Sequence, residues 1–218
     1  MSRAVPIVPT IIVALAALLM VRLGFWQIHR LHEKEALLAL YSANAAKPAL
    51  PFAALFPIGD AALYRRASAH CLNVVGWKAE AGRSASGAPG WRHVAACRTG
   101  IEGPGFMVDM GVSPSSATPA WTGGDVRGRI TWAPGGVSWL ARLFTTPQAR
   151  SPMIVSETAA PGLVPTAQPN PSDIPNNHLS YAVQWFIFAG LALTIYALAL
   201  WQRRRKASSG NSPERRKP

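Results

Sequence analysis

The fold of this chain is decided by LSYAVQWFIFAGLALTIYALALWQ, residues 179–202, a stretch without a single charged side chain. The hydrocarbon core of a bilayer is about 30 Å thick, so a helix of about 20 apolar residues is long enough to cross it. The stretch meets that requirement and runs directly into the basic sequence RRRK at residues 203–206. We therefore predict a transmembrane helix over residues 178–201.

A second uncharged run lies at the start of the chain, over residues 4–21. Its two prolines stand at its beginning, where a helix loses least from a missing backbone donor. Residues 14–16, Ala-Leu-Ala, are similar to a signal-peptide cleavage site, but the apolar sequence continues past them to Trp26. Cleavage there would fall inside the hydrophobic core, so we favour an uncleaved anchor over a signal peptide and predict a first span over residues 4–26.

The basic residues indicate how the two spans are oriented. The chain has a formal net charge of +12, and residues 202–218 contribute half of it, with seven Lys or Arg against one Glu. Such a cluster beside a span is held on the cytoplasmic side, which makes residues 1–3 cytoplasmic too. The central region then lies outside the cytoplasm, in the periplasm if the membrane is a bacterial inner membrane. The tail lacks interleaved aromatics, so we expect contact with anionic lipids and no nucleic-acid partner.

Residues 27–45 have helical spacing and are predicted to continue the first span as a juxtamembrane helix. Trp26, Arg30 and Lys34 recur every four residues and therefore share one face. The indole suits the membrane interface, and the two cations suit the lipid headgroups. His29 and His32 stand near two glutamates and form a candidate metal pair, although two histidines on an interfacial helix more often face water.

Residues 46–174 change character, because short apolar runs alternate there with Gly and Pro. The proline-rich residues 47–57 read as a linker, residues 159–175 as an extended lead-in to the second span, and residues 83–90 as a mobile turn. Four to six strands of a small, mostly antiparallel sheet are predicted, at residues 63–75, 91–99, 105–112, 126–132 and 152–158. The predicted fold class is a membrane protein with two transmembrane helices flanking a β-rich (α+β) extracytoplasmic domain.

The central region carries few signals of catalysis. It contains no nucleophile elbow, phosphate-binding loop or zinc-protease motif, and its histidines, His70 and His93, lack triad spacing. We therefore expect no enzymatic activity, with a membrane-anchored hydrolase as the rival interpretation. Cys71 and Cys97 do not form a CxxC pair. An oxidising compartment permits a disulfide between them, and two small buried residues are an equally good interpretation.

Two motifs at the ends of the chain resemble those of the Surfeit locus family of cytochrome c oxidase assembly proteins. LGFWQIHRLHEKEALL, residues 23–38, is similar to the first-span signature, a Gly followed by Trp-Gln, an Arg and a Lys. PNNHLSYAVQWFIFA, residues 175–189, is similar to the second, Asn-His-Leu-x-Tyr-Ala-x-x-Trp-Phe. Shorter similarities lie between them in the family's order: LYRRASAHC at 63–71, GWRHVAACR at 90–98, GPGFMVDMGVSP at 103–114 and VRGRI at 126–130.

The chain departs from the family pattern at two places. Residues 109–112 read Asp-Met-Gly-Val, where the family usually has Asn-Arg-Gly-Trp, so an Arg and a Trp are missing. Any partner contact carried by that strand end is therefore in doubt. Residues 134–152 match no part of the pattern.

The resemblance implies a role in building haem-copper cytochrome c oxidase. Family members are similar to chaperones that help insert haem a into the catalytic subunit, beside haem A synthase, so both proteins are expected partners. His178 is then the expected haem-iron ligand, and Tyr181 and Trp185 complete the cofactor site. The alternative is a scaffold that binds oxidase subunits without binding haem. Four further residues are expected at a partner or membrane interface: Trp26, Gln27, Arg30 and Lys34.

The position of His178 gives this implication a physical basis. Asn176 or Asn177 is expected to cap the helix, which places His178 in its first turn. The positive end of the helix favours an uncharged imidazole, the form that ligates iron. Tyr181, Trp185 and Phe188 follow on the same face and offer a flat apolar surface, although such a stripe more often faces lipid or packs on the other span. At small-xxx-small spacing, Gly190 and Thr194 are predicted to let the spans approach closely.

Overall fold

The computed structural model describes residues 6–55, 57–100, 105–133 and 150–209, with side chains up to Lys206. It divides the chain into two compact units, one of Met1–Glu35 with Pro175–Pro218 and one of Ala36–Ile174. The predicted cytoplasmic residues 1–3, the last nine residues of the basic tail and most of the unmatched stretch 134–152 lie outside the described residues.

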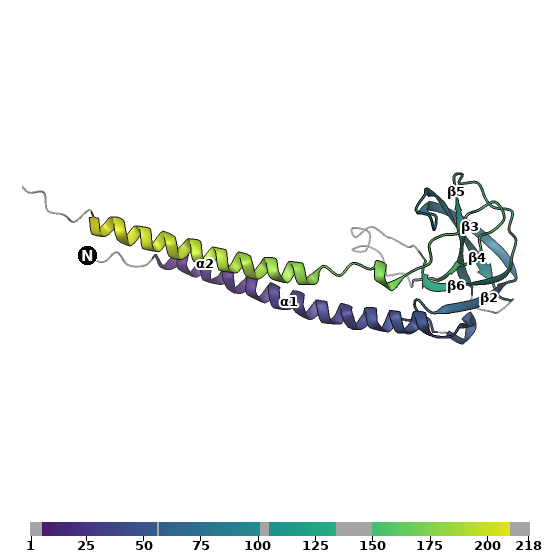
Figure 1. The fold of residues 1–218 in the computed structure, drawn as a ribbon, viewed down its shortest axis with the longest axis horizontal. Helices are drawn as coiled ribbons and strands as arrows, with labels where there is room; N and C mark the ends of the chain where they lie inside the picture. The colour runs from purple at the N-terminus through teal and green to yellow at the C-terminus, as the bar shows by residue number, and fades with distance from the viewer. Residues whose placement is uncertain (1–5, 56, 101–104, 134–149, 210–218) are drawn as a thin grey trace, which may run out of the picture. The chain divides into compact units, whose positions relative to one another are not determined.

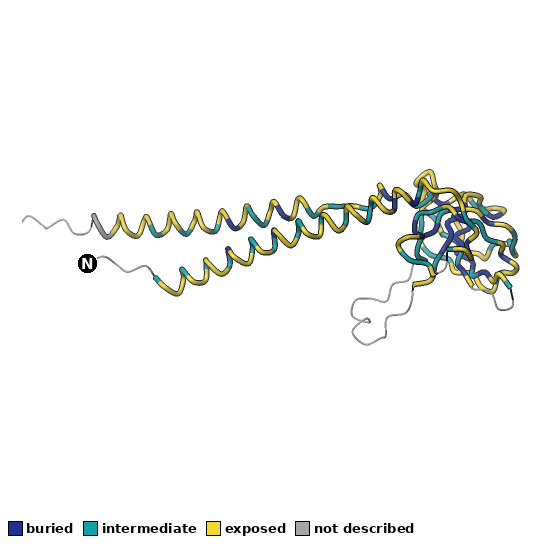
Figure 2. Tube along the Cα trace, turned by 90° about the horizontal axis from the view of Figure 1, so that it is seen from below, coloured by how far each residue is buried: buried dark blue, intermediate teal, exposed yellow. Residues whose placement is uncertain are grey.

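The first unit consists of two long apolar helices that run side by side (Figure 1). Helix α1 is Ile7–Ala46 and helix α2 is His178–Ser209, and both are long and apolar enough to cross a membrane. Figure 2 shows most residues of both helices as exposed, which suits side chains that meet lipid rather than a protein core. The predicted first span therefore does continue into the juxtamembrane segment as one helix, and two such helices flank a β-rich domain as predicted.

The second unit is built on a mixed seven-stranded sheet in the order β1-β2-β6-β7-β5-β4-β3. The β1–β2 and β5–β7 pairs are parallel, and the other four neighbouring pairs are antiparallel. The prediction of a mostly antiparallel sheet is confirmed, whereas the predicted number of strands was too low. The strands are β1 Leu50–Pro51, β2 Arg66–Cys71, β3 Asn73–Arg83, β4 Pro89–Arg98, β5 Phe106–Ser113, β6 Gly124–Trp132 and β7 Pro152–Ser156.

One predicted strand is in fact two. Residues 63–75 contain no Gly or Pro to mark a break, yet β2 ends at Cys71 and β3 begins at Asn73, with only Leu72 between them. In the strand order of the sheet, β2 is second and β3 is last. The sheet must therefore curl strongly to bring the end of β2 within one residue of the start of β3. Leu72 marks the junction, since its N–H donates to the carbonyl of Arg98 at 2.8 Å.

The segments predicted as a linker and a lead-in both pack on the domain. Leu50 and Pro51 pair with Ala67 and Ser68, and the 3-10 turn η1, Phe52–Leu55, buries Phe52. The linker prediction for residues 47–57 was therefore wrong, because proline also suits an edge strand whose N–H faces outward. The later segment pairs Val164 with Val112 and ends in the short 3-10 turn η3, Pro171–Asp173.

The last turns of α1 belong to the β-rich unit. Tyr41 is buried and donates a hydrogen bond from its hydroxyl to Asp60 Oδ1 at 3.0 Å. Asn44 is fully buried, and its Nδ2 donates to the carbonyls of Asp60 and Leu63 at 3.1 and 3.2 Å. Buried amides need such partners, so these bonds fix residues 36–46 on the domain.

Cys71 and Cys97 form a disulfide inside the core of the β-rich unit, which settles the alternative that the sequence leaves open. The two Cα atoms lie 5.3 Å apart, and both residues are buried. Cys71 ends β2, and Cys97 lies near the end of β4. The bond therefore links two strands that are not neighbours in the sheet.

The core also contains a carboxylate, Asp109 on β5, which is completely buried. Its Oδ1 accepts hydrogen bonds from the N–H of Gly111 at 3.0 Å and from the hydroxyl of Thr166 at 2.8 Å. Its Oδ2 has no hydrogen-bond partner among the described residues and lies 3.8 Å from Arg92 Nη1. Burial raises the pKa of Asp109, as does the nearby Glu80 charge, against the lowering effect of the two hydrogen bonds and of Arg92.

We expect Asp109→Asn to make the β-rich unit more stable at neutral pH. Because the folded-state pKa is raised, the folded state holds the proton more tightly than the unfolded chain. The contribution of the protonated Asp109 to the free energy of unfolding is therefore fully present below the ordinary carboxyl pKa of about 4. It is lost as pH rises through the raised pKa of Asp109 in the folded state. Asparagine keeps the acceptor for Gly111 and Thr166 and does not titrate. Thermal unfolding of the full chain in detergent should show the variant's advantage growing as pH rises.

The control for this experiment is Asp173→Asn, which neutralises an exposed carboxylate. Its unfolding temperature should follow that of the parent at every pH. If the parent gains stability over the variant as pH rises, attraction between Asp109 and Arg92 outweighs the desolvation of the carboxylate, and the prediction is wrong.

Candidate functional site

The candidate site lies at the start of α2, where the second terminal motif turns from loop into helix. Helix α2 begins at His178, and the N–H of Tyr181 donates to the carbonyl of Asn177 at 3.2 Å. Asn177 thus stands at the capping position through its backbone. The side-chain oxygen of Asn176 is buried and accepts no hydrogen bond from any residue that the structure describes, so it does not cap the helix. His178 occupies the first turn, as the sequence predicts.

His178 is held by a residue from the other end of the chain. Its Nδ1 lies 2.7 Å from Gln27 Oε1 on α1, across a separation of 151 residues. An amide oxygen only accepts, so the imidazole must donate its Nδ1–H. This fixes the tautomer of a neutral ring and leaves Nε2 with its lone pair. The hydrogen bond therefore joins the two terminal motifs, one residue from each.

A small cleft adjoins this pair. It has a volume of about 260 Å³ and is lined by Gln27, Pro175, Asn177, His178 and Tyr181. Every lining residue belongs to the helical unit. Tyr181, one turn after His178, is half exposed. The cleft therefore presents an imidazole and a phenol ring side by side at the end of an apolar helix.

The aromatic stripe of α2 is partly exposed. Trp185 and Phe188 meet edge to face with ring centroids 6.3 Å apart, and about half of Phe188 remains accessible. The aromatic that packs against α1 is Phe186, whose ring lies 5.3 Å from that of Phe25. Tyr181, Trp185 and Phe188 therefore share an accessible face, and the contact with the other span is made by their neighbour.

The two helices approach through small residues spaced seven apart. Ala17 and Gly24 on α1 and Ala182 and Ala189 on α2 are buried. A Cβ on Gly24 would lie 2.7 Å from the ring of Phe186, so this glycine makes room for the aromatic. Seven residues are close to two helical turns, and the spacing resembles the packing of left-handed helix pairs.

The predicted approach at Gly190 is wrong. A Cβ there would meet no atom within 4 Å, and Thr194 donates its hydroxyl to the carbonyl of Gly190 in its own helix. Gly190 and Thr194, whose four-residue spacing suggested this contact, lie on a face of α2 that does not pack against α1. Farther along the helices, Thr10 and Tyr196 share a hydrogen bond between their hydroxyls.

The remaining interface residues of α1 do not line the cleft at His178. Trp26 is half exposed, and Arg30 forms an ion pair with Glu33 on its own helix. The two histidines of this helix also face carboxylates nearby, His29 with Glu33 at 3.1 Å and His32 with Glu35 at 3.4 Å. Lys34 is partly buried. Four residues were predicted to lie at a partner or membrane interface, and of these Gln27 is the one that lines the candidate site.

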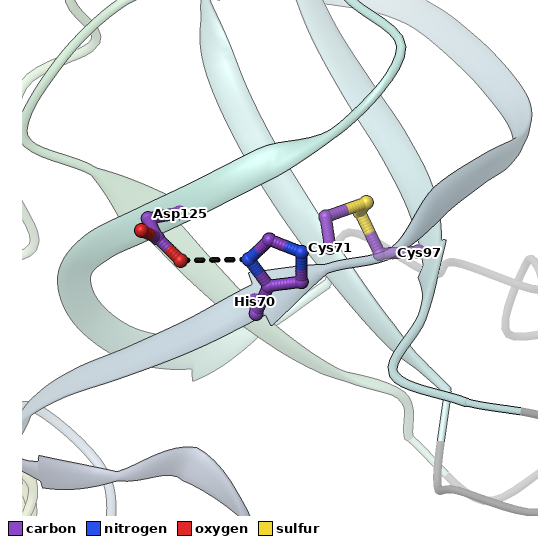
Figure 3. Close-up of a disulfide and its surroundings, with 4 residues drawn as sticks. All are labelled: His70, Cys71, Cys97 and Asp125. Carbon is purple, nitrogen blue, oxygen red and sulfur yellow. Dashed lines mark hydrogen bonds and ion pairs between the residues drawn. A yellow bond between two sulfur atoms is a disulfide. The ribbon is translucent and has the colours of Figure 1, made fainter.

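The histidines of the β-rich unit occupy different settings. His93 is buried, and its Nε2 is satisfied by Ser113 Oγ at 2.9 Å and by the carbonyl of Ser115 at 3.0 Å. His70 is exposed, and its Nδ1 lies 2.7 Å from Asp125 Oδ1 (Figure 3). Sequence reasoning missed this pair, because its members stand 55 residues apart on two strands. Within residues 6–55, 57–100, 105–133 and 150–209, no three His, Cys, Asp or Glu cluster as a metal site.

Comparison with known proteins places this geometry in a wider context. A model of the SURF1 family matches residues 14–190 of the chain. The matched region contains both terminal motifs, both residues of the Gln27–His178 pair and the whole β-rich unit. A search of curated proteins found no significant match.

Proposed function

This chain belongs to the SURF1 family, a family of cytochrome oxidase assembly factors rather than enzymes, and from this we propose that it assists the delivery of haem a to the catalytic subunit of the oxidase. The resemblance based on the two terminal motifs is thereby confirmed at the level of the family. The haem, the named partners and the membrane belong to the proposal.

The observation that carries the proposal is the Gln27–His178 hydrogen bond. A histidine that ligates a metal through one nitrogen usually donates its other N–H to an acceptor, which orients the ring and raises its basicity. Gln27 Oε1 is such an acceptor for Nδ1. Nε2 makes no hydrogen bond within the part of the chain that the structure describes, and His178 lines the cleft. These residues fit a group that needs one imidazole ligand.

The surroundings of His178 also suit a flat apolar cofactor. Tyr181 lines the same cleft, and Trp185 follows one turn later on the same face. When bound, haem a supplies an iron that accepts an axial imidazole. The protein's part is to orient His178 and to offer Tyr181 and Trp185 as apolar surface. One protein ligand holds such a group less firmly than two, which suits a protein that must pass it on.

The partners and location follow from the same proposal. The catalytic subunit receives the haem, haem A synthase supplies it, and membrane lipids surround both spans. Trp26, Arg30 and Lys34 stand where α1 would leave the bilayer and are proposed to contact headgroups or a partner. The proposed location is a bacterial inner membrane, and the basic tail after α2 favours the orientation in which both termini lie in the cytoplasm and the β-rich unit lies in the periplasm.

The scaffold alternative rests on the β-rich unit. A protein that only holds oxidase subunits together needs a folded domain and an anchor, and this chain has a β-rich domain and two helices long and apolar enough to serve as the anchor. It needs no available histidine nitrogen at the end of a helix. The alternative therefore explains the sheet and leaves the Gln27–His178 pair unexplained.

The test is the visible absorption spectrum of the protein purified in detergent from cells that also make haem A synthase. We expect haem a absorbance in the parent and none in His178→Ala. Gln27→Leu removes the acceptor and should lower the affinity for haem by about 10–100-fold, the range typical of such orienting partners. Gln27→Glu keeps an acceptor oxygen and should retain most of the haem.

Matched controls are His29→Ala and His32→Ala, which remove exposed histidines from α1. Both should keep the spectrum of the parent. If His178→Ala keeps the haem a spectrum, another residue ligates the iron and the proposed role of His178 is wrong. Absence of haem from every variant and from the parent, with haem A present in the membranes, would favour the scaffold.

A further inference from the structure

The outer face of the β2–β6 pair places polar side chains directly opposite one another. The antiparallel register sets Ser68 across from Arg127 and His70 across from Asp125. This face forms one side of a cleft of about 440 Å³. The other lining comes from residues 51–53 on β1 and η1 and from Thr99 after β4. The cleft belongs to the β-rich unit and is distinct from the site at His178.

Arg127 lines this cleft, and its guanidinium forms no ion pair with the described residues of the protein. Two arginines share its face, and each has a partner: Arg66 pairs with Glu157 at 3.1 Å, and Arg129 donates to the carbonyl of Tyr64 at 3.4 Å. The side chain of Arg127 is exposed and makes no ion pair or hydrogen bond with any described residue. A guanidinium lining a cleft without a partner is available to an anion from outside.

A further donor points to the same kind of ligand. Ser68 carries a hydroxyl opposite Arg127, on the same face of the sheet. The carboxylate of Asp125 accepts a hydrogen bond from His70 Nδ1 at 2.7 Å, and this bond orients the ring (Figure 3). A carboxylate group matches this arrangement, because the guanidinium fork binds two oxygens at once.

The walls of the cleft are fixed by the disulfide. Cys71 follows His70 directly, and Cys97 precedes Thr99 by two residues, so the bond holds both walls in place (Figure 3). The outer edge of β2 is covered only in part, because β1 pairs with Ala67 and Ser68 alone. From Ala69 to Cys71, β2 has no strand on that side within the described sheet. An extended chain can add to an edge of this kind.

We propose that this cleft binds an extended segment of a partner protein through an acidic side chain, whose carboxylate pairs with Arg127. Charge complementarity selects an acidic segment, and the free edge of β2 selects an extended one. The site goes beyond the proposed haem function and does not depend on it, since none of its residues lies in the helical unit.

The test uses the full chain in detergent and two fluorescein-labelled, end-blocked peptides, Val-Glu-Val-Glu-Val and Val-Gln-Val-Gln-Val, followed by fluorescence anisotropy. The Glu peptide should bind at least tenfold more tightly than the Gln peptide, because a charge-assisted hydrogen bond typically contributes more than the 1.4 kcal/mol that a tenfold change requires. Arg127→Gln should weaken the Glu peptide by a similar factor. Arg127→Lys should give an intermediate affinity, since it keeps the charge and loses the fork.

The matched control is Arg83→Gln at the end of β3, where the side chain donates to the carbonyl of Gly87 and to no other residue in the described part of the chain. It should bind like the parent. Equal binding of the two peptides, no binding at millimolar concentration, or full binding by Arg127→Gln would each overturn the proposal. Competition by free glutarate at the affinity of the Glu peptide would show a site for small carboxylates, and so would overturn the protein segment as the occupant. None of these outcomes bears on haem, so this proposal and the haem proposal fail separately.

Discussion

Removing the disulfide should lower the free energy of unfolding of the β-rich unit by about 3.5 kcal/mol, the loop-closure value for its 26-residue separation. The bond joins β2 to β4, two strands that are not neighbours in the sheet. The nearby hydrogen bond from the Leu72 N–H to the Arg98 carbonyl exists only in the folded state, whereas the disulfide also restricts the unfolded chain. Urea unfolding of the full chain in detergent, followed by tryptophan fluorescence, measures the effect in Cys71→Ala/Cys97→Ala. A cost of that size is roughly a quarter to two thirds of the about 5–15 kcal/mol by which ordinary domains are stable.

The single variants distinguish the crosslink from packing. Cys71→Ala and Cys97→Ala each abolish the same bond, so each should cost nearly as much as the double variant. If the sulfur atoms acted only as buried apolar groups, the two single effects would add to give the double effect. Additive values, or a loss below about 1 kcal/mol, would show that the bond contributes little to stability.

The helical unit was predictable because its signals are local. A long run of uncharged apolar residues indicates a span without any knowledge of partners. Helix α1 covers residues 7–26 of the first predicted span, and α2 covers the whole of the second. The β-rich unit depends on contacts between distant residues. Nothing in residues 63–75 shows that Leu72 ends one strand and starts another, because the kink follows from closing the sheet and not from a local turn residue.

The candidate site divides in the same way. His178 and its aromatic neighbours follow one another along α2, so their common face could be predicted from helical periodicity. The role of Gln27 could not, because its bond to His178 spans 151 residues. The available signal was the shared membership of Gln27 and His178 in two motifs of one family. That signal places both residues in the pattern of one family, and it carries no information on the distance between them.

Gly128→Ala should prevent the β-rich unit from folding stably, with a loss of more than about 3 kcal/mol, the upper end of ordinary overpacking. A Cβ at this position would lie 1.8 Å from the carbonyl oxygen of Val155 and 2.6 Å from its carbon. Both are backbone atoms and cannot rotate away. Strand β6 pairs with β2 on one side and β7 on the other, so it cannot shift without breaking hydrogen bonds to one of them.

Gly76→Ala is the matched control, since Gly76 also lies in a strand but a Cβ there would meet no atom within 4 Å. It should be neutral or stabilising by up to about 1 kcal/mol, because alanine loses less backbone entropy on folding. The measurement is the yield of folded protein together with the thermal unfolding midpoint. Similar midpoints for the two variants would show that β7 can move away from β6, and would refute the prediction. Both glycines look alike in the sequence, and the difference arises entirely from the strand that packs beside Gly128.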